Sequence, residues 1–419
     1  MSPETKNNLK VIIPSIILVL LIVIIGIVAL RNIDSQTGGE TDGNSDTGTD
    51  ATPTAAQRPT PALIDMHQFG STADDNPLSI AVDTTGIYVV GDTEGDLDGI
   101  NAGDLALATP EVADALGASH TTNLPSATDA FVEKYSLDGS RKLWGHQFGT
   151  EFIDSARGVS VNATGVYVAG QTEGTLDAPL IGNIDAFLRK YTQAGVLVWS
   201  KQFGTNKTDE GLWVVSNEEQ ICLGGGTLGA IGDGVHVGDE DIYVRCYDPD
   251  GNELWTTQFG SPKFEEALGA TIDATGIYLT GATGGQIGDD PRVGNTDAWF
   301  GKLSLDGDLL YTNQFGSRNI DFNHGIAVDG TNIYSLGRTE GRYPGEKSRG
   351  GSDAVVSAWS GNGSTMLWSD QFGTEDGDSG QAIIASDSGI FAIGSLNGKS
   401  EKHGEITNLE DGYLRQYSP

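Results

Sequence analysis

The sequence predicts an all-β fold, a six-bladed β-propeller, and three observations support this prediction. The tripeptide Gln-Phe-Gly occurs six times, with its glutamine at positions 68, 147, 202, 258, 314 and 371 and intervals of 79, 55, 56, 56 and 57 residues. Each repeat contains four short apolar runs separated by turn residues, which is typical of a four-stranded sheet. The last repeat stops after its third run, and a matching fourth run precedes the first repeat. A fixed period of this length indicates one supersecondary unit copied in series.

The second repeat shows the four runs most clearly. We expect strands at Arg157–Asn162, Val166–Gly170, Asp185–Tyr191 and Val196–Phe203. Turns rich in Asp, Asn and Gly join the first run to the second and the third to the fourth, as hairpins require. Because the connections are hairpin-like, each sheet is predicted to be an antiparallel meander. Six such sheets favour a propeller over a β-solenoid, whose coils are usually much shorter.

The phase of the repeats predicts how the ring closes. Leu63–Phe69 matches a fourth strand, whereas Asp411–Tyr417, at the other end of the chain, matches a third strand. The N-terminal strand would therefore complete the last blade and remove a free sheet edge. We expect the propeller to span residues 63–419, with an insertion at about 98–122.

Composition excludes one class of partner. The 419 residues include 59 glycines, and 58 acidic side chains outnumber 24 basic ones, for a net charge of −34. Residues 1–62 hold only six of the acids and four of the bases, so the folded part carries −32. Such a field repels phosphate backbones, which argues against nucleic acid as a partner. It would attract cations or a basic partner, or simply keep the protein soluble.

The N-terminal residues predict a membrane anchor. Val11–Leu30 is apolar except for Pro14, Ser15 and Gly26, and at ~1.5 Å per residue it would reach roughly 30 Å, enough to cross a bilayer. Lys6 and Lys10 precede it, so residues 1–10 should be a cytoplasmic tail. Residues 31–62 read as a disordered acidic linker. The expected product is a single-pass cell-membrane protein with its propeller outside; a cleaved signal is the alternative.

An acidic residue follows each Gln-Phe-Gly glutamine by seven positions, in the loop entering the innermost strand: Asp75, Asp154, Asp209, Glu265, Asp321 and Asp378. A ring of carboxylates at the mouth of the central channel could bind Ca²⁺ through oxygen ligands, and Ca²⁺ is the one cofactor that the sequence suggests. The alternative is that each carboxylate caps its own turn through backbone N–H groups. A second acidic series begins the third strands: Asp129, Asp185, Asp241, Asp297, Asp353 and Asp411.

The two cysteines predict a disulfide. Cys222 replaces a tyrosine or phenylalanine of the second strand, and Cys246 replaces the residue found opposite on the third strand. Both positions change to cysteine in one repeat only, which argues that their side chains meet. A Cys222–Cys246 bond would fit an oxidising exterior; two buried thiols are the alternative.

The inserted loop of the first repeat is the strongest break in the pattern. Thr109-Pro110-Glu111 is a helix start, so we expect a short helix at Pro110–Leu116. Insertions often form the binding face of repeat proteins, although this one could be a neutral elaboration. The candidate binding residues are Asp96, Asp98, Asp104, Thr109 and Glu111.

Two further motifs carry less weight. Asn162, Asn206 and Asn362 begin Asn-x-Ser/Thr sequons and are candidate glycosylation sites, whose use depends on the host. Gly377-Asp378-Ser379-Gly380 resembles the nucleophile motif of trypsin-like proteases, but its Asp-Ser aligns with Asp154-Ser155 of another repeat. The six histidines show no metal-ligand spacing, so no catalytic residue is predicted.

The repeats resemble a known family. Asn183–Trp199, Phe203-Gly204 and Gly165–Thr172 follow the consensus of the SBBP β-propeller repeats. The resemblance covers residues 63–419 and implies a propeller on a secreted or cell-surface protein, with no shared catalytic residues. The family name refers to seven blades, whereas this sequence supplies six.

Together these features predict a membrane-anchored extracellular propeller that serves as a non-catalytic binding or scaffold module. Its partner would be an extracellular protein or glycan. One alternative is a cation-dependent surface hydrolase or lyase that uses the acidic face. A second alternative is a structural component of the cell envelope.

Overall fold

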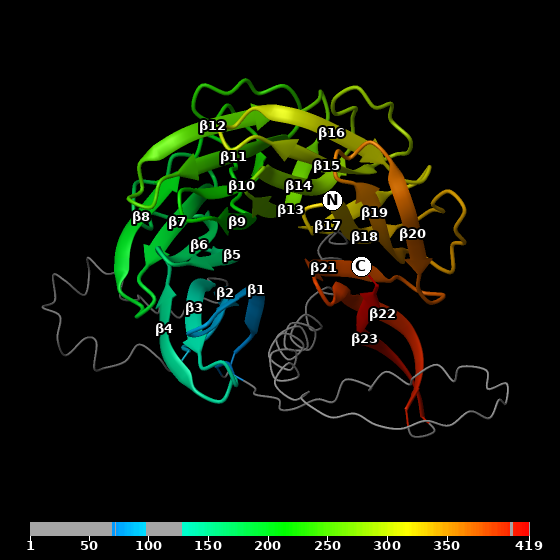
Figure 1. Cartoon of the computed structure of the whole chain (residues 1–419). Coiled ribbons are helices and arrows are strands. Elements are labelled where there is room, and N and C mark those ends of the chain that lie inside the picture. Colours follow the sequence, from blue (N-terminus) through cyan, green and yellow to red (C-terminus); the bar gives the residue numbers. More distant parts are fainter. Residues whose placement is uncertain (1–68, 72, 98–127, 403–404, 419) are drawn as a thin grey trace, which may run out of the picture.

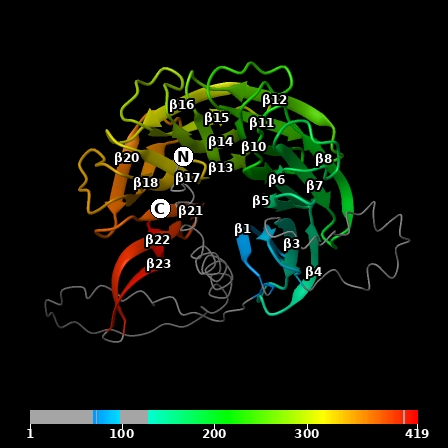
Figure 2. The ribbon, with the colours of Figure 1, turned by 180° about the vertical axis from the view of Figure 1, so that it is seen from behind.

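The computed structural model describes residues 69–71, 73–97, 128–402 and 405–418 (Figure 1). These residues form six antiparallel sheets that radiate from a common centre in both ribbon views (Figures 1 and 2). Five sheets contain four strands each, paired in chain order, and the sixth contains three described strands. The predicted six-bladed β-propeller is therefore confirmed.

In each four-stranded blade the first strand lies nearest the centre and the fourth lies at the rim (Figure 1). Blades 1 and 2 contain β1 (Asp75–Asp83), β2 (Gly86–Thr93), β3 (Asp129–Tyr135), β4 (Lys142–Phe148), β5 (Asp154–Asn162), β6 (Gly165–Thr172), β7 (Asp185–Tyr191) and β8 (Leu197–Phe203). Blades 3 and 4 contain β9 (Trp213–Ser216), β10 (Ile221–Thr227), β11 (Asp241–Tyr247), β12 (Glu253–Phe259), β13 (Glu265–Asp273), β14 (Gly276–Thr283), β15 (Asp297–Leu303) and β16 (Leu309–Phe315). Blades 5 and 6 contain β17 (Asp321–Val328), β18 (Asn332–Thr339), β19 (Asp353–Ser360), β20 (Met366–Phe372), β21 (Ser379–Ser386), β22 (Gly389–Lys402) and β23 (Glu405–Tyr417).

Aromatic side chains of the outer strands interlock neighbouring blades. The indole Nε1 of Trp144 donates to the carbonyl of Gln193, in a turn of blade 2, at 3.1 Å. Gly195 of that turn has a φ of 90°, and a Cβ there would lie 2.8 Å from the Trp144 ring. The turn therefore needs glycine both for its conformation and for the close approach of the indole. The same bond recurs from Trp199 to Pro249 and from Trp255 to Leu305.

Apolar clusters seal the seams between blades. Five clusters each combine side chains of two adjacent blades, from blades 1 and 2 round to blades 5 and 6. A sixth cluster, around Ile87, Val89 and Phe131 of blade 1, packs against Phe69, which precedes β1 and ends the predicted closing strand. Because side chains alternate along a strand, this cluster lies on the face of blade 1 that points away from blade 2.

A disulfide joins Cys222 and Cys246, as predicted. The two residues are direct register partners on β10 and β11 of blade 3. In blade 1 the equivalent pair is Tyr88 and Lys134, and the Lys134 ammonium lies over the Tyr88 ring at 4.8 Å from its centroid. The cysteines thus replace a noncovalent pair with a covalent one at the same place in the blade.

The sixth blade contains a feature that the sequence analysis missed. β22 and β23 have 14 and 13 residues, and their pairing continues from Ile390–Tyr417 out to Lys402–Glu405. They form a hairpin that projects beyond the ring, shown in red in Figure 1. In the other blades a loop, rather than a continued ladder, follows the second strand.

Several predictions concern residues outside the described ranges. These are the cytoplasmic tail 1–10, the span 11–30, the linker 31–62, most of the closing strand 63–69, and the helix at Pro110–Leu116. Within the ranges that the structure describes, there is no helix long and apolar enough to cross a membrane.

Removing the disulfide should destabilise blade 3. It closes a loop with a sequence separation of 24 residues, so the variant Cys222→Ala/Cys246→Ala should lose about 3 kcal/mol of unfolding free energy. For a domain of this size the melting temperature should fall by roughly 4 °C. Differential scanning calorimetry with and without dithiothreitol measures the effect. Reductant should shift the wild type and leave the variant unchanged; two free thiols in the untreated protein would contradict the prediction.

Candidate functional site

The six acids of the inner ring are bound within their own blades. In every blade the carboxylate accepts the backbone N–H of the residue four positions earlier, for example Thr150 to Asp154 at 2.5 Å and Ser317 to Asp321 at 2.7 Å. The same bond forms at Asp75, Asp209, Glu265 and Asp378. These are the contacts of the turn-capping alternative. In the described part of the chain no three His, Cys, Asp or Glu side chains are grouped as metal ligands, and Ca²⁺ binding at this ring stays a prediction.

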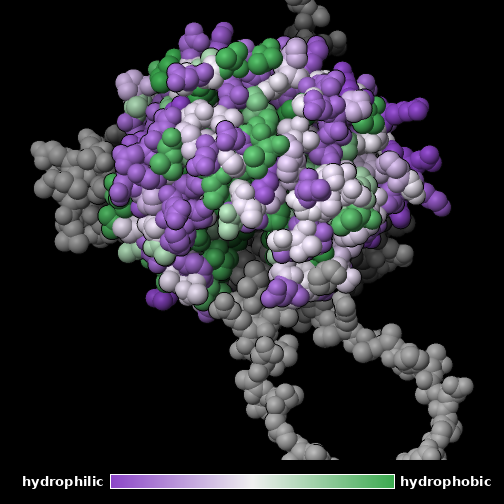
Figure 3. Space-filling view, turned by 45° about the horizontal axis from the view of Figure 1, so that its top comes forward, coloured by the Kyte–Doolittle hydropathy of each residue, from purple (hydrophilic) through white to green (hydrophobic). Residues whose placement is uncertain are grey.

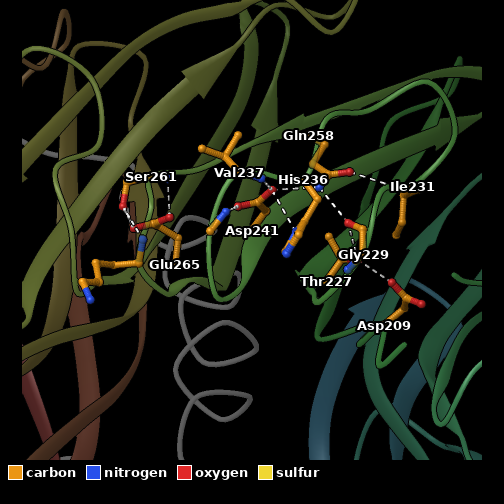
Figure 4. A network of polar contacts seen from close by, with 12 residues as sticks. Asp209, Thr227, Gly229, Ile231, His236, Val237, Asp241, Gln258, Ser261 and Glu265 are labelled. Carbon is orange, nitrogen blue, oxygen red and sulfur yellow. Dashed lines mark hydrogen bonds and ion pairs between the residues drawn. The ribbon is translucent and has the colours of Figure 1, made fainter. Parts of the chain in front are cut away.

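The Gln-Phe-Gly glutamine clamps the loop between the second and third strands. In blade 3 (Figure 4) Gln258 Oε1 accepts the N–H of Ile231 at 2.9 Å, while its Nε2 donates to the Gly229 carbonyl and to Asp241, each at 2.9 Å. The same three contacts form at Gln147, Gln202, Gln314 and Gln371. The acids that begin the third strands (Asp129, Asp185, Asp241, Asp297 and Asp353) are thus the acceptors of the clamp.

Burial raises the pKa of several acids of the inner ring and of the clamp. It raises the pKa of Asp154 and of Asp321 to about 6, although hydrogen bonds from neighbouring Thr and Ser groups oppose the shift. Burial also raises the pKa of Asp129, Glu265 and Asp378. Glu240, just before β11, has its pKa raised to about 8 by burial and by the charges of Glu266 and Glu210.

Only Asp96 of the candidate binding loop is described; Asp98, Asp104, Thr109 and Glu111 lie outside the described residues. Asp96 is exposed, between two residues held by the blade 1 clamp: Gln147 donates to the Gly95 carbonyl and accepts the N–H of Leu97. The residues that directly precede the insertion are therefore held by hydrogen bonds to Gln147.

The three sequon asparagines differ in setting. Asn162 is partly buried, and its Nδ2 donates to the Ser216 hydroxyl and the Asn217 carbonyl of blade 3, so a glycan there would have to displace these contacts. Asn206 and Asn362 are exposed. Glycosylation at all three stays a prediction.

Exposed aliphatic side chains recur on the clamped loops. Ile181, Val237 and Val293 stand four residues before the third-strand acid and are 54%, 49% and 45% exposed. The backbone N–H of each donates to that acid at 2.7–3.0 Å, so these side chains are presented by a fixed backbone. Other exposed apolar side chains lie on the outer strands, among them Val198, Leu254 and Leu310. On the face in Figure 3 apolar groups appear as separate green patches among hydrophilic ones.

Two positions near the centre vary between blades while their surroundings repeat. Ten residues after the clamp glutamine stand Leu78, Arg157, Leu212, Leu268, His324 and Gln381; twenty-four residues after it stand Asp92, Gln171, Gly226, Ala282, Arg338 and Ser395. In five blades the first of these positions is a β-bulge, a feature common beside functional sites. The sequence analysis missed both sets, and comparing the six repeats position by position would have found them.

No family model matches the chain. The regulatory protein FlaEY of Caulobacter vibrioides is 26% identical over 207 residues, which cover 43% of this chain and 22% of FlaEY. The chain therefore spans less than a quarter of that relative.

Solved structures with a similar arrangement include the Pan2 WD40 domain of Neurospora crassa, with a TM-score of 0.45 and 9% identity over 82% of this chain and 79% of that one. An ulvan lyase of polysaccharide lyase family PL25 has a TM-score of 0.43 and 14% identity over 84% and 81% of the two chains. The propeller assignment itself rests on the sheets and registers described above.

Breaking one clamp should cost much more than removing an exposed glutamine. In the variant Gln314→Ala the N–H of Ile287 and the Asp297 carboxylate each lose a buried partner, which should cost about 2–3 kcal/mol. Gln286→Ala, at an exposed position of the same blade, is the matched control and should change stability by less than about 0.5 kcal/mol. Calorimetry compares the two; equal melting temperatures would refute a structural role for the clamp.

Stability should rise as the pH is lowered from 8.5 to 5.5. Glu240 has a folded-state pKa of about 8, against an ordinary value of 4.5, so the folded protein binds its proton more tightly than the unfolded chain does. Its stabilising contribution is complete below the ordinary pKa and is lost as the pH rises through about 8. Asp154 and Asp321 act in the same direction up to pH about 6. Melting curves of the wild type and Glu240→Gln over this range provide the test: the variant should show a flatter dependence, and parallel curves would contradict the assignment.

Proposed function

We propose that this chain is a non-catalytic binding module of the SBBP repeat type, displayed at the cell surface. Residues 11–30 anchor it as a single-pass membrane protein, residues 1–10 lie in the cytoplasm, and the propeller is outside. Its partner is an extracellular protein or glycan. The Cys222–Cys246 disulfide supports this placement, because such bonds persist in oxidising compartments.

The observation that carries the binding role is the row of aliphatic side chains on the clamped loops. Ile181, Val237 and Val293 belong to blades 2, 3 and 4 and stand at the same repeat position, so a partner that spans adjacent blades meets them in succession. About half of each side chain is exposed, while the backbone beneath it is held by partly buried hydrogen bonds to the third-strand acid. A preordered apolar surface loses little entropy on binding. The likeness to FlaEY, named a regulatory protein, is compatible with a binding role.

A pull-down from cell-envelope extract with the full chain tests the proposal. Wild-type protein should capture a partner, and the variant Ile181→Ser/Val237→Ser/Val293→Ser should bind it at least tenfold more weakly. The matched control is Val198→Ser/Leu254→Ser/Leu310→Ser, which removes outer-strand side chains of equal exposure, 50–53%, and should bind as the wild type does. A parallel arm with a calcium chelator tests the predicted cation. Loss of binding by the control alone, or no capture at all, would overturn the proposal.

A further inference from the structure

Three side chains form a stack in blade 5 at the centre of the ring. Phe322 and His324 lie two residues apart on β17, with ring centroids 6.3 Å apart and an interplanar angle of 10°. Arg338 is the register partner of Phe322 on β18, and its guanidinium carbon lies 5.0 Å from the Phe322 centroid. The guanidinium and the imidazole therefore both lie against Phe322, the Arg338 charge acts on the imidazole, and all three side chains are partly exposed.

The imidazole is fixed in orientation by the next blade. His324 Nδ1 lies 3.0 Å from the carbonyl oxygen of Gly380 on β21. A carbonyl can only accept a hydrogen bond, so Nδ1 carries the proton and the neutral ring has a lone pair on Nε2. Burial and the nearby Arg338 charge lower the pKa of His324 to about 4, which keeps the ring neutral at pH 7. His324 thus offers an acceptor beside a cation.

The guanidinium is available for an anion. Arg189, Arg245 and Arg415 pair with Asp177, Glu253 and Asp370. Arg338 is absent from the ion pairs found among the described residues. Stacking on Phe322 positions the guanidinium plane, and the N–H edge of such a group matches a carboxylate in two parallel hydrogen bonds.

No other blade repeats this combination. Relative to its clamp glutamine, blade 5 places Phe322, His324 and Arg338 where blade 2 has Ser155, Arg157 and Gln171. The surrounding frame repeats in every blade, with an acid immediately before the first of these positions and a glycine immediately before the last. Repeated residues are explained by the fold, whereas this set needs a different explanation.

We propose that the Phe322–His324–Arg338 stack binds a hydroxycarboxylate, with the carboxylate on Arg338 and a neighbouring hydroxyl donating to His324 Nε2. Uronic acid residues of a glycan and free hydroxy acids share this chemistry. The inference deepens the proposed binding function and rests on it, since it names the ligand class of a site at the centre of the ring.

The overall charge of the protein restricts the ligand. A folded part with a net charge of −32 repels anions at long range, but at physiological ionic strength fields decay over about 8 Å. For a ligand that bears one carboxylate per residue, the attraction to Arg338 at contact then outweighs the long-range repulsion. Densely charged polyphosphates carry more repulsion and fit a neutral histidine acceptor poorly.

Isothermal titration of the full chain tests the site with D-glucuronate, trigalacturonate and L-lactate, and with D-glucose as the uncharged control. Arg338→Gln and His324→Leu are suitable variants, because they install the residues that blades 2 and 4 carry at the same positions, Gln171 and Leu268. Arg318→Gln removes an equal charge from an exposed arginine. We expect D-glucuronate to bind and D-glucose not to bind. The Kd should rise at least tenfold in Arg338→Gln, rise less in His324→Leu, and stay unchanged in Arg318→Gln.

The outcomes separate this inference from the proposed function. Equal affinity in wild type and Arg338→Gln, or no binding of any acid, overturns the stack as a site. If envelope capture nevertheless persists and depends on Ile181, Val237 and Val293, the proposed function stands without the site. Tighter binding of trigalacturonate than of L-lactate supports a glycan ligand; equal binding supports a free hydroxy acid at the same site. Binding of D-glucuronate that is lost in Arg338→Gln, in a protein that captures nothing from the envelope, keeps the site and rejects the aliphatic surface.

Discussion

The glutamine clamp is the contact on which the blades of this propeller depend. One side chain joins a loop carbonyl, a loop N–H and the acid that begins the third strand, and it does so in all five blades where the glutamine is described. Each partner is a buried or partly buried polar group, and leaving it without a hydrogen bond would cost free energy. The clamp therefore explains why glutamine and aspartate recur together in the sequence. It also explains why the acids that begin the third strands recur so regularly, since each accepts a hydrogen bond that holds its blade together.

The framework could be predicted because it repeats. Six copies of one pattern predicted the strand order of the described blades and the cysteine pair, since each position could be compared with its equivalents. Boundaries were less accurate: β5 begins at Asp154 rather than Arg157, because the capped acid is itself the first residue of the strand. The long β22–β23 hairpin was missed because its extra length has no equivalent in the other repeats.

The candidate ligand site could not be predicted in the same way. His324 looked like one of six scattered histidines, and its spacing in the sequence matched no known ligand pattern. Its chemistry comes from a bulge in β17, a backbone carbonyl in the next blade and an arginine on the neighbouring strand. Contacts of this kind join residues far apart in the chain, so composition and periodicity do not predict them. The exposed row of Ile181, Val237 and Val293 could not be predicted either, since exposure is a property of the folded loop.

Because of the clamp, the loop between the second and third strands can vary in length without disturbing its blade. The clamp holds only the first few residues of the loop and the acid at its end, so the segment between them is free to vary. In blade 1 the interval between glutamines is 79 residues instead of about 56, yet Gln147 makes the same contacts as its equivalents. New loops could therefore be acquired or exchanged one blade at a time without repacking the core.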